Sequence, residues 1–176
     1  MFEIRLAEPG DVPRLPEIEE RAGEMFKGTP VEKYVSPSPL PVSRLDAGRK
    51  LGLLWVALTG EGTLVGFVLA EHIGGGIHIE EVDVLPEYGR LGIGTALIQR
   101  VLRKGKEEGC RAVTLCTFRD VPWNAPFYAR LGFEELHPSE LTPALRQRMR
   151  EEAERGLPAE RRLAMRCRVE IAQPRV

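Results

Sequence analysis

The sequence predicts one α/β (α+β) domain over residues 1–176, built on a mixed, mostly antiparallel central sheet flanked by helices. Between residues 53 and 85, three β-rich runs follow one another with no helix between them, which favours antiparallel neighbours. A glycine-rich turn then leads from the third run into an amphipathic helix and on to a further strand. The 176 residues, 43% of them hydrophobic, suffice for one domain with its own core.

The first part of the chain predicts a strand, a helix, an irregular loop and a second helix. Phe2–Ala7 alternates like a strand, and Asp11–Phe26 repeats apolar residues at three- and four-residue steps, as an amphipathic helix does. Gly28–Pro41 contains four prolines and cannot be regular. Long irregular loops in compact domains are often functional. A short helix over Val42–Lys50 follows this loop.

The central runs predict three consecutive strands. Leu53–Leu58 and Leu64–Ile73 are separated by a Gly-Glu-Gly turn and indicate a hairpin, and Ile77–Leu85 is the third strand. In this third strand the apolar positions change from odd to even numbers. A one-residue bulge near Glu80 and Glu81 would return them to one face, and bulges often lie beside active sites.

The second half of the chain alternates between helices and strands. An apolar stripe predicts a helix over Gly94–Glu108, which Gly109 ends. The elements expected after it are a strand Ala112–Thr117, a short helix Ala125–Leu131, a strand Phe133–Leu136, a polar helix Pro138–Arg155 and a final strand Leu163–Ile171.

Charge and composition exclude several classes of protein. The 25 basic and 26 acidic residues leave a net charge of −1, so no strongly basic field indicates a nucleic-acid partner. No apolar run approaches the roughly 20 residues of a membrane span, and three charged residues among the first eight exclude a signal peptide. Cys110, Cys116 and Cys167 lack CxxC or Cys/His spacing and predict neither a disulfide framework nor a metal site. We expect a cytoplasmic protein without membrane or nucleic-acid partners.

The turn between the third strand and the long helix carries the most chemistry. Gly89, Gly92 and Gly94 remove side chains at the start of a helix, where freed amides and the helix dipole can hold an anion. Arg90 adds a positive charge beside them. A dinucleotide-binding turn would need glycine where Leu97 stands, and the Gly-Lys-Ser/Thr of a Walker loop is absent.

Two blocks of sequence resemble the GNAT superfamily of acyl-coenzyme A-dependent N-acyltransferases. The first is the turn GRLGIGT at 89–95, and the second is NAPFYARLGF at 124–133, similar to the family's Asn…Tyr…Leu-Gly-Phe signature. They stand in the family's order and spacing, and the order of elements over residues 2–136 matches too. One departure is Gly89, which stands where the family commonly has Gln or Arg. The resemblance implies the GNAT-like fold.

The resemblance also implies acetyl-CoA as co-substrate. Backbone amides of the turn would hold its pyrophosphate, and the strand segment before the turn would pair with its pantetheine arm through Val82 and Val84, in the manner of an added strand. Asn124 resembles the family's residue on the far side of that arm. The coenzyme-binding residues implied in the turn are Arg90, Leu91, Gly92, Ile93, Gly94 and Thr95, and those in the strand are Val82, Asp83 and Val84.

N-acylation needs a neutral amine and a proton for the departing thiolate. Tyr128 stands at the family's general-acid position, and a phenol with a pKa near 10 can protonate a thiolate of comparable basicity. For the general base, Glu80 and His78 both match positions that carry bases in members of the family. Glu81 is the alternative if the bulge reverses the two faces of the strand.

These features predict an N-acetyltransferase that acts on a primary amine of a small molecule, peptide or protein. A non-catalytic module that binds or senses acyl-CoA is the alternative. A nucleic-acid-associated protein using the arginine-rich stretch 161–168 is disfavoured by the balanced charge. The acceptor and the choice of base stay open, and a homodimer is compatible with the sequence.

Overall fold

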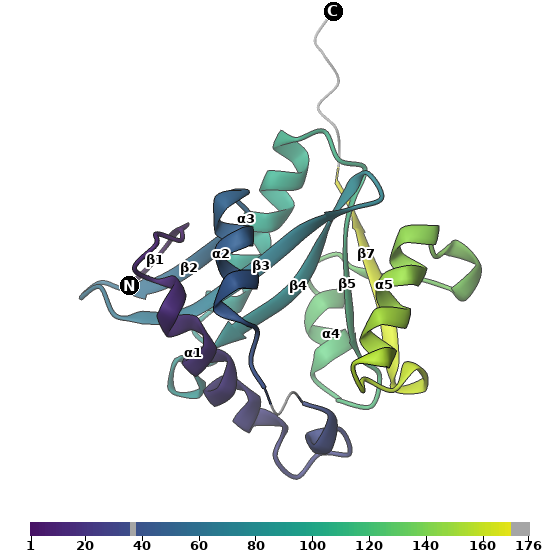
Figure 1. Cartoon of the computed structure of the whole chain (residues 1–176), viewed down its shortest axis with the longest axis horizontal. Coiled ribbons are helices and arrows are strands. Elements are labelled where there is room, and N and C mark those ends of the chain that lie inside the picture. The colour runs from purple at the N-terminus through teal and green to yellow at the C-terminus, as the bar shows by residue number, and fades with distance from the viewer. Residues whose placement is uncertain (36–37, 170–176) are drawn as a thin grey trace, which may run out of the picture. The chain divides into compact units, whose positions relative to one another are not determined.

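A computed structural model describes residues 1–35 and 38–169 of the chain (Figure 1). The chain divides into two compact units. Unit 1 comprises Met1–Gly28, Val35–Glu71 and Ile79–Val101, and unit 2 comprises Thr29–Tyr34, His72–His78 and Leu102–Val176. That the chain forms one domain stays a prediction.

Among the described residues, seven strands are connected by hydrogen bonds in the order β1-β2-β3-β4-β5-β7-β6. The strand β4 has its first residues in unit 2 and its later residues in unit 1. Four neighbouring pairs, β1–β2, β2–β3, β5–β7 and β6–β7, are antiparallel. The predicted class, a mixed sheet flanked by helices, is therefore confirmed. The strands are β1 Phe2–Leu6, β2 Leu54–Thr59, β3 Leu64–Ile73, β4 Gly76–Val84, β5 Ala112–Phe118, β6 Glu134–Glu135 and β7 Arg162–Arg168.

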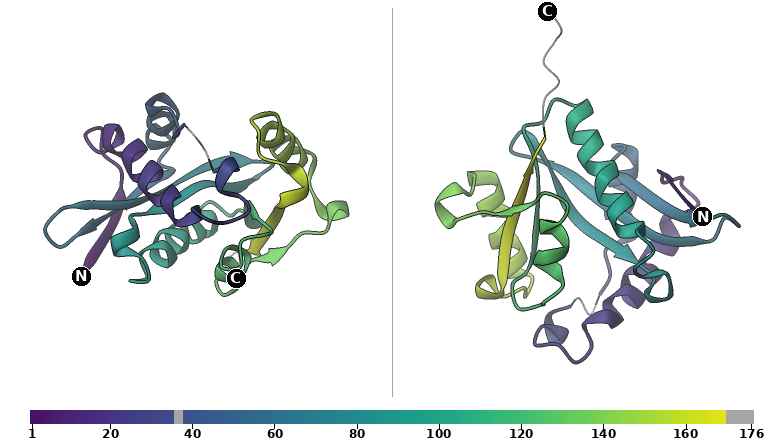
Figure 2. Two further views of the ribbon diagram at one scale, coloured as in Figure 1. Left: turned by 90° about the horizontal axis from the view of Figure 1, so that it is seen from below. Right: turned by 180° about the vertical axis from the view of Figure 1, so that it is seen from behind.

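In unit 1, α1 and α2 cover one face of β2 and β3, and the first part of α3 covers the other face (Figure 2). The predicted helix over 11–26 is divided into three pieces, because Pro13 and Pro16 each open a new helical segment and Gly23 begins the last one. The helical segments of unit 1 are a 3₁₀ turn Val12–Arg14, α1 Leu15–Ala22, a 3₁₀ turn Gly23–Phe26, α2 Val42–Lys50, a 3₁₀ turn Pro86–Tyr88 and the start of α3 Ile93–Glu107.

Two glycines of unit 1 allow its layers to approach closely. A Cβ on Gly48 of α2 would lie 2.2 Å from the Cδ1 of Leu69 on β3. A Cβ on Gly66 of β3 would lie 2.6 Å from the carbonyl oxygen of Asp83 on β4. The absence of a side chain at Gly66 therefore sets how closely β3 lies against the segment of β4 that carries the predicted site residues.

Unit 2 is built from the start of β4, the end of α3, and β5, β6 and β7 with two further helices. The predicted helix over 138–155 is again divided, because Thr142 accepts a hydrogen bond from the Leu145 amide at 3.2 Å and caps a new helix that opens with Pro143. The predicted final strand ends at Arg168, and its positions 170 and 171 lie outside the described residues, as do positions 36 and 37 of the loop predicted over 28–41. The helical segments of unit 2 after α3 are α4 Asn124–Ala129, a 3₁₀ turn Pro138–Glu140, α5 Pro143–Glu154 and a 3₁₀ turn Ala159–Arg161. Within the described ranges, no helix combines the length and the apolar character needed to cross a membrane.

Candidate functional site

The turn between β4 and α3 has the backbone of an anion cradle. Arg90 has φ 62° and Gly92 has φ 82°, so two residues of a three-residue stretch are left-handed. When left-handed and right-handed backbone conformations alternate in this way, the N–H groups of successive residues point toward the same side. The first N–H groups of α3, beginning at Ile93, have no carbonyl within the helix to accept their hydrogen bonds. They also lie at the positive end of the helix dipole. A left-handed arginine costs roughly 1–3 kcal/mol, and such strain clusters at binding sites.

The strand segment before the turn carries Val82, Asp83 and Val84. All three are half-buried, whereas Ile77 and Ile79 at the start of β4 are buried. The bulge near Glu80 and Glu81 stays a prediction.

Asp83 holds a buried carboxylate oxygen. Its Oδ2 has no hydrogen-bond partner among the described residues. Burial raises the pKa of Asp83 well above its ordinary value of 3.8, and the nearby carboxylates of Glu81 and Glu19 raise this pKa further. Ionising this side chain is therefore costly in the folded chain.

We expect the Asp83→Asn variant to be more stable than the wild type at neutral pH. In the wild type, the folded chain binds the Asp83 proton more tightly than the unfolded chain does. The bound proton therefore stabilises the wild type fully below pH 3.8, and this contribution is lost as pH rises through the raised pKa. The measurement is the free energy of unfolding in urea between pH 4 and pH 8. Asn binds no proton in this range, so the variant should lose less stability with rising pH.

The control for this prediction is Glu61→Gln, which removes an exposed carboxylate on the β2–β3 turn and should leave the pH dependence as in the wild type. Equal pH slopes for the wild type and Asp83→Asn would contradict the prediction.

Glu80 forms an ion pair with Arg44 in which the carboxylate is the buried partner. Its side chain is 5% exposed, and Arg44 Nη2 on α2 donates to Glu80 Oε2 as well as to Glu71 Oε2, the latter at 3.3 Å. On the neighbouring helix α1, Glu19 Oε2 accepts from the Leu40 amide at 2.8 Å, and burial raises the pKa of Glu19. Unit 1 thus gathers carboxylates from α1, β3 and β4 around the later part of β4.

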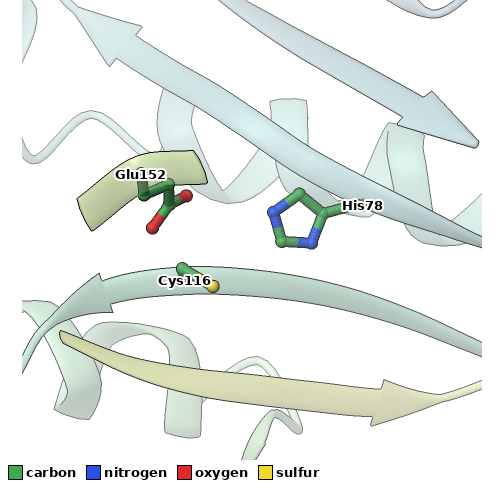
Figure 3. A group of neighbouring side chains, drawn as sticks. All are labelled: His78, Cys116 and Glu152. Carbon is green, nitrogen blue, oxygen red and sulfur yellow. The ribbon is translucent and has the colours of Figure 1, made fainter. Parts of the chain in front are cut away.

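His78 lies in unit 2 and is 1% exposed. Its Nδ1 is 2.9 Å from Thr114 Oγ1, and its ring faces Cys116 on β5 and Glu152 on α5 (Figure 3). Burial lowers the pKa of His78 to about 3, and the positive charges of Arg148 and Arg162 act in the same direction. The imidazole is therefore neutral at physiological pH and a weak proton acceptor.

Tyr128 and Asn124 lie on the short helix α4 of unit 2. The Tyr128 ring meets Phe127 and Phe133 edge-on, with centroids 5.1 and 6.1 Å away. The backbone carbonyl of Tyr128 accepts a hydrogen bond from the Phe133 amide at 3.1 Å. Gly132, with φ 89°, lies where the chain reverses direction after the helix. The Leu-Gly-Phe segment therefore orients the tyrosine by folding back onto it.

Several partners of these residues were not predicted from the sequence. Arg44 is 36 positions from Glu80, and no local pattern links the two. The arginine-rich stretch 161–168 contains Arg162, which is 12% exposed in its side chain and pairs with Glu152. Arg161 and Arg166 of the same stretch pair with Asp120 and Glu140. Three arginines of this stretch are therefore paired with acidic residues, although the sequence shows only a run of basic residues.

Comparison with known proteins identifies relatives of one kind. The sequence model of the acetyltransferase (GNAT) family matches residues 18–133, which include the turn 89–95 and the helix of Tyr128. An uncharacterized N-acetyltransferase of Methanocaldococcus jannaschii is 42% identical over 57 residues, 32% of this chain. The aligned part is 25% of the relative, so the chain spans about a quarter of the length of this curated protein.

Solved structures share the fold. The ribosomal-protein-S18-alanine N-acetyltransferase of Escherichia coli has a TM-score of 0.68 at 16% identity, covering 100% of this chain and 99% of that one. The PaiA N-acetyltransferase of Thermoplasma acidophilum, solved in complex with coenzyme A, has a TM-score of 0.71 at 18% identity, covering 96% and 99%. At these identities the likeness establishes the fold.

Proposed function

Because the chain belongs to the acetyltransferase (GNAT) family, we propose that it transfers an acetyl group from acetyl-CoA to a primary amine. The observation that carries the proposal is the turn with left-handed Arg90 and Gly92 ahead of α3, inside the span that the family matches. A cradle of amides at a helix start suits the pyrophosphate of a coenzyme.

The turn fits coenzyme A through its backbone. The side chains of Arg90 and Leu91 are exposed, so they leave the backbone of the turn open to a ligand. Amides of residues 90–95 would hold the pyrophosphate. Gly89 lacks the Gln or Arg side chain common in the family, so one peripheral contact would be lost and the backbone contacts kept. Val82 and Val84 would pair with the pantetheine arm through their backbone.

For the general base we propose Glu80. An ionised carboxylate can accept a proton from an ammonium group, and the buried position of Glu80 strengthens its attraction to a cation. Arg44 orients the carboxylate. His78 is the weaker candidate, because an imidazole with a pKa of about 3 is a poor base at neutral pH. Glu81 is the alternative on the same strand.

The direct test is a thiol-release assay with acetyl-CoA and a panel of amines, with mass spectrometry of the products. The panel includes amino acids, peptides with free N-termini, lysine peptides, polyamines and aminoglycosides. Turnover with an N-acetylated product supports the proposal. Coenzyme binding without turnover on any amine would instead favour the non-catalytic acyl-CoA-binding module.

We expect Glu80→Gln to lower turnover by roughly 10- to 1000-fold at neutral pH, the range of general-base effects, with little change in coenzyme affinity. Glutamine keeps the size of the side chain and a hydrogen bond to Arg44 but accepts no proton. His78→Gln is the comparison and should have the smaller effect. The measurement is kcat against pH on the acceptor that the panel identifies. Full activity in both variants would show that deprotonation occurs in solution.

A further inference from the structure

Three side chains that can bind metal ions converge inside unit 2. His78 comes from β4, Cys116 from β5 and Glu152 from α5, and one ligand atom of each lies within 4.8 Å of the other two (Figure 3). His78 and Glu152 are 1% and 6% exposed, and Cys116 packs on a cluster of buried apolar residues. Nitrogen, sulfur and oxygen ligands are thus brought together in a place shielded from water.

A hydrogen bond orients the histidine for an ion. His78 Nδ1 is 2.9 Å from Thr114 Oγ1, two positions before Cys116 on β5. With its proton on Nδ1, the ring donates to this hydroxyl, and the lone pair of Nε2 is available to an ion. In histidines that bind metals, the N–H of the other ring nitrogen ordinarily donates a hydrogen bond to an oxygen, which sets the tautomer and the ring plane.

The carboxylate is oriented in the same way. Arg162 donates to Glu152 Oε2 from Nε at 3.2 Å and from Nη2 at 3.0 Å. Both bonds engage one carboxylate oxygen, and the second oxygen can bind an ion. A ligating carboxylate is commonly hydrogen-bonded on its other side in this manner.

The charges of the group balance a divalent ion. A thiolate and a carboxylate together carry two negative charges, which balance the two positive charges of the ion. Arg148 and Arg162 would therefore lie near a neutral complex. When the ion binds, the S–H bond of Cys116 breaks, a sulfur–metal bond forms, and the proton passes to water. Tetrahedral zinc holds its ligand atoms about 3.3–3.8 Å apart, so these atoms have to approach one another by at most about 1–1.5 Å.

A pocket of unit 2 is lined by residues that neighbour the group. It has a volume of about 350 Å³, and its lining includes Met149, Arg162 and Ala164. Met149 lies three residues before Glu152 on α5, and Ala164 is paired with Cys116 in the β5–β7 register. The pocket is thus lined by neighbours of two of the three ligands.

We propose that His78, Cys116 and Glu152 form a binding site for one divalent transition-metal ion, with zinc as the favoured ion. Thiolate and imidazole together select zinc over magnesium or calcium, which prefer oxygen ligands. Three protein ligands leave a fourth position for water. The proposal does not depend on acetyl transfer, although one of its ligands, His78, is also the weaker candidate for the base.

The test uses the full chain after dialysis against a chelator. Cobalt(II) is added, and the absorption band of a thiolate–cobalt bond is followed. We expect one equivalent of cobalt to develop the band and zinc to displace it. Cys116→Ser should abolish the band, whereas the matched control Cys110→Ser should keep it. Glu152→Gln, which retains a hydrogen bond to Arg162, should weaken binding by at least about 10- to 100-fold, the range found when a supporting group is lost.

A second measurement needs no variant. Zinc should protect Cys116 of the wild-type chain from alkylation, as read by mass spectrometry of the peptides, and should leave Cys167 reactive. Absence of the cobalt band in the wild type, a band that survives in Cys116→Ser, or alkylation of Cys116 that zinc does not slow would each overturn the proposal.

Discussion

The Gly94→Glu variant is expected to lose acetyl-CoA binding by at least about 100-fold. Gly94 is the second residue of α3 and follows the left-handed Arg90 and Gly92 of the turn. Glutamate there adds a side chain and a negative charge where the proposed cradle receives a pyrophosphate. Charge-assisted hydrogen bonds contribute roughly 1.5–3 kcal/mol each, so losing one or two of them accounts for such a change.

Titration calorimetry with acetyl-CoA measures this effect, with circular dichroism to verify the fold. Two controls separate charge from shape and from position. Gly94→Ala adds a methyl group without charge, and Gln99→Glu adds the same charge at an exposed position further along α3. Unchanged affinity in a folded Gly94→Glu variant would show that the turn is not the coenzyme site.

The sequence predicts the limits of a helix or strand correctly where proline or glycine stands next to its ends. The helix Val42–Lys50 and the strand Leu64–Ile73 match their predicted bounds, because Pro41 precedes the first and glycines flank the second. The two long helices predicted over 11–26 and 138–155 are divided, since internal prolines favour new helix starts over continuous hydrogen bonding. Periodicity alone had joined segments that the backbone separates.

The functional residues divide in the same way. The turn 89–95 and the Tyr128 helix are each one continuous segment, so their residue types pointed to them directly. The surroundings of Glu80 and His78 depend on contacts with residues far along the chain. Arg44 reaches Glu80 from α2, and Cys116 and Glu152 reach His78 from β5 and α5. No spacing rule links side chains on three separate elements, so the spacing of the cysteines could not indicate the metal site that we propose.

The Tyr128→Phe variant is expected to lower turnover by roughly 10- to 1000-fold while the KM for acetyl-CoA changes little. Phenylalanine keeps the ring and hence its edge-on contacts with Phe127 and Phe133, so the fold of α4 should survive. The variant removes the hydroxyl alone. If Tyr128 protonates the departing thiolate, the missing proton donor slows that step and leaves coenzyme binding nearly intact.

The leaving group supplies the internal control for this variant. A series of acyl thioesters with increasingly acidic thiols needs progressively less protonation, so the ratio of wild-type to Tyr128→Phe turnover should shrink along the series. A residue that merely packs would lower turnover by the same factor for every donor, or not at all. The measurement is kcat for each donor with one acceptor at saturating concentration. Because phenylalanine can make the same ring contacts as Tyr128, a ratio that depends on thiol acidity points to the hydroxyl proton and not to altered packing of Phe127 or Phe133.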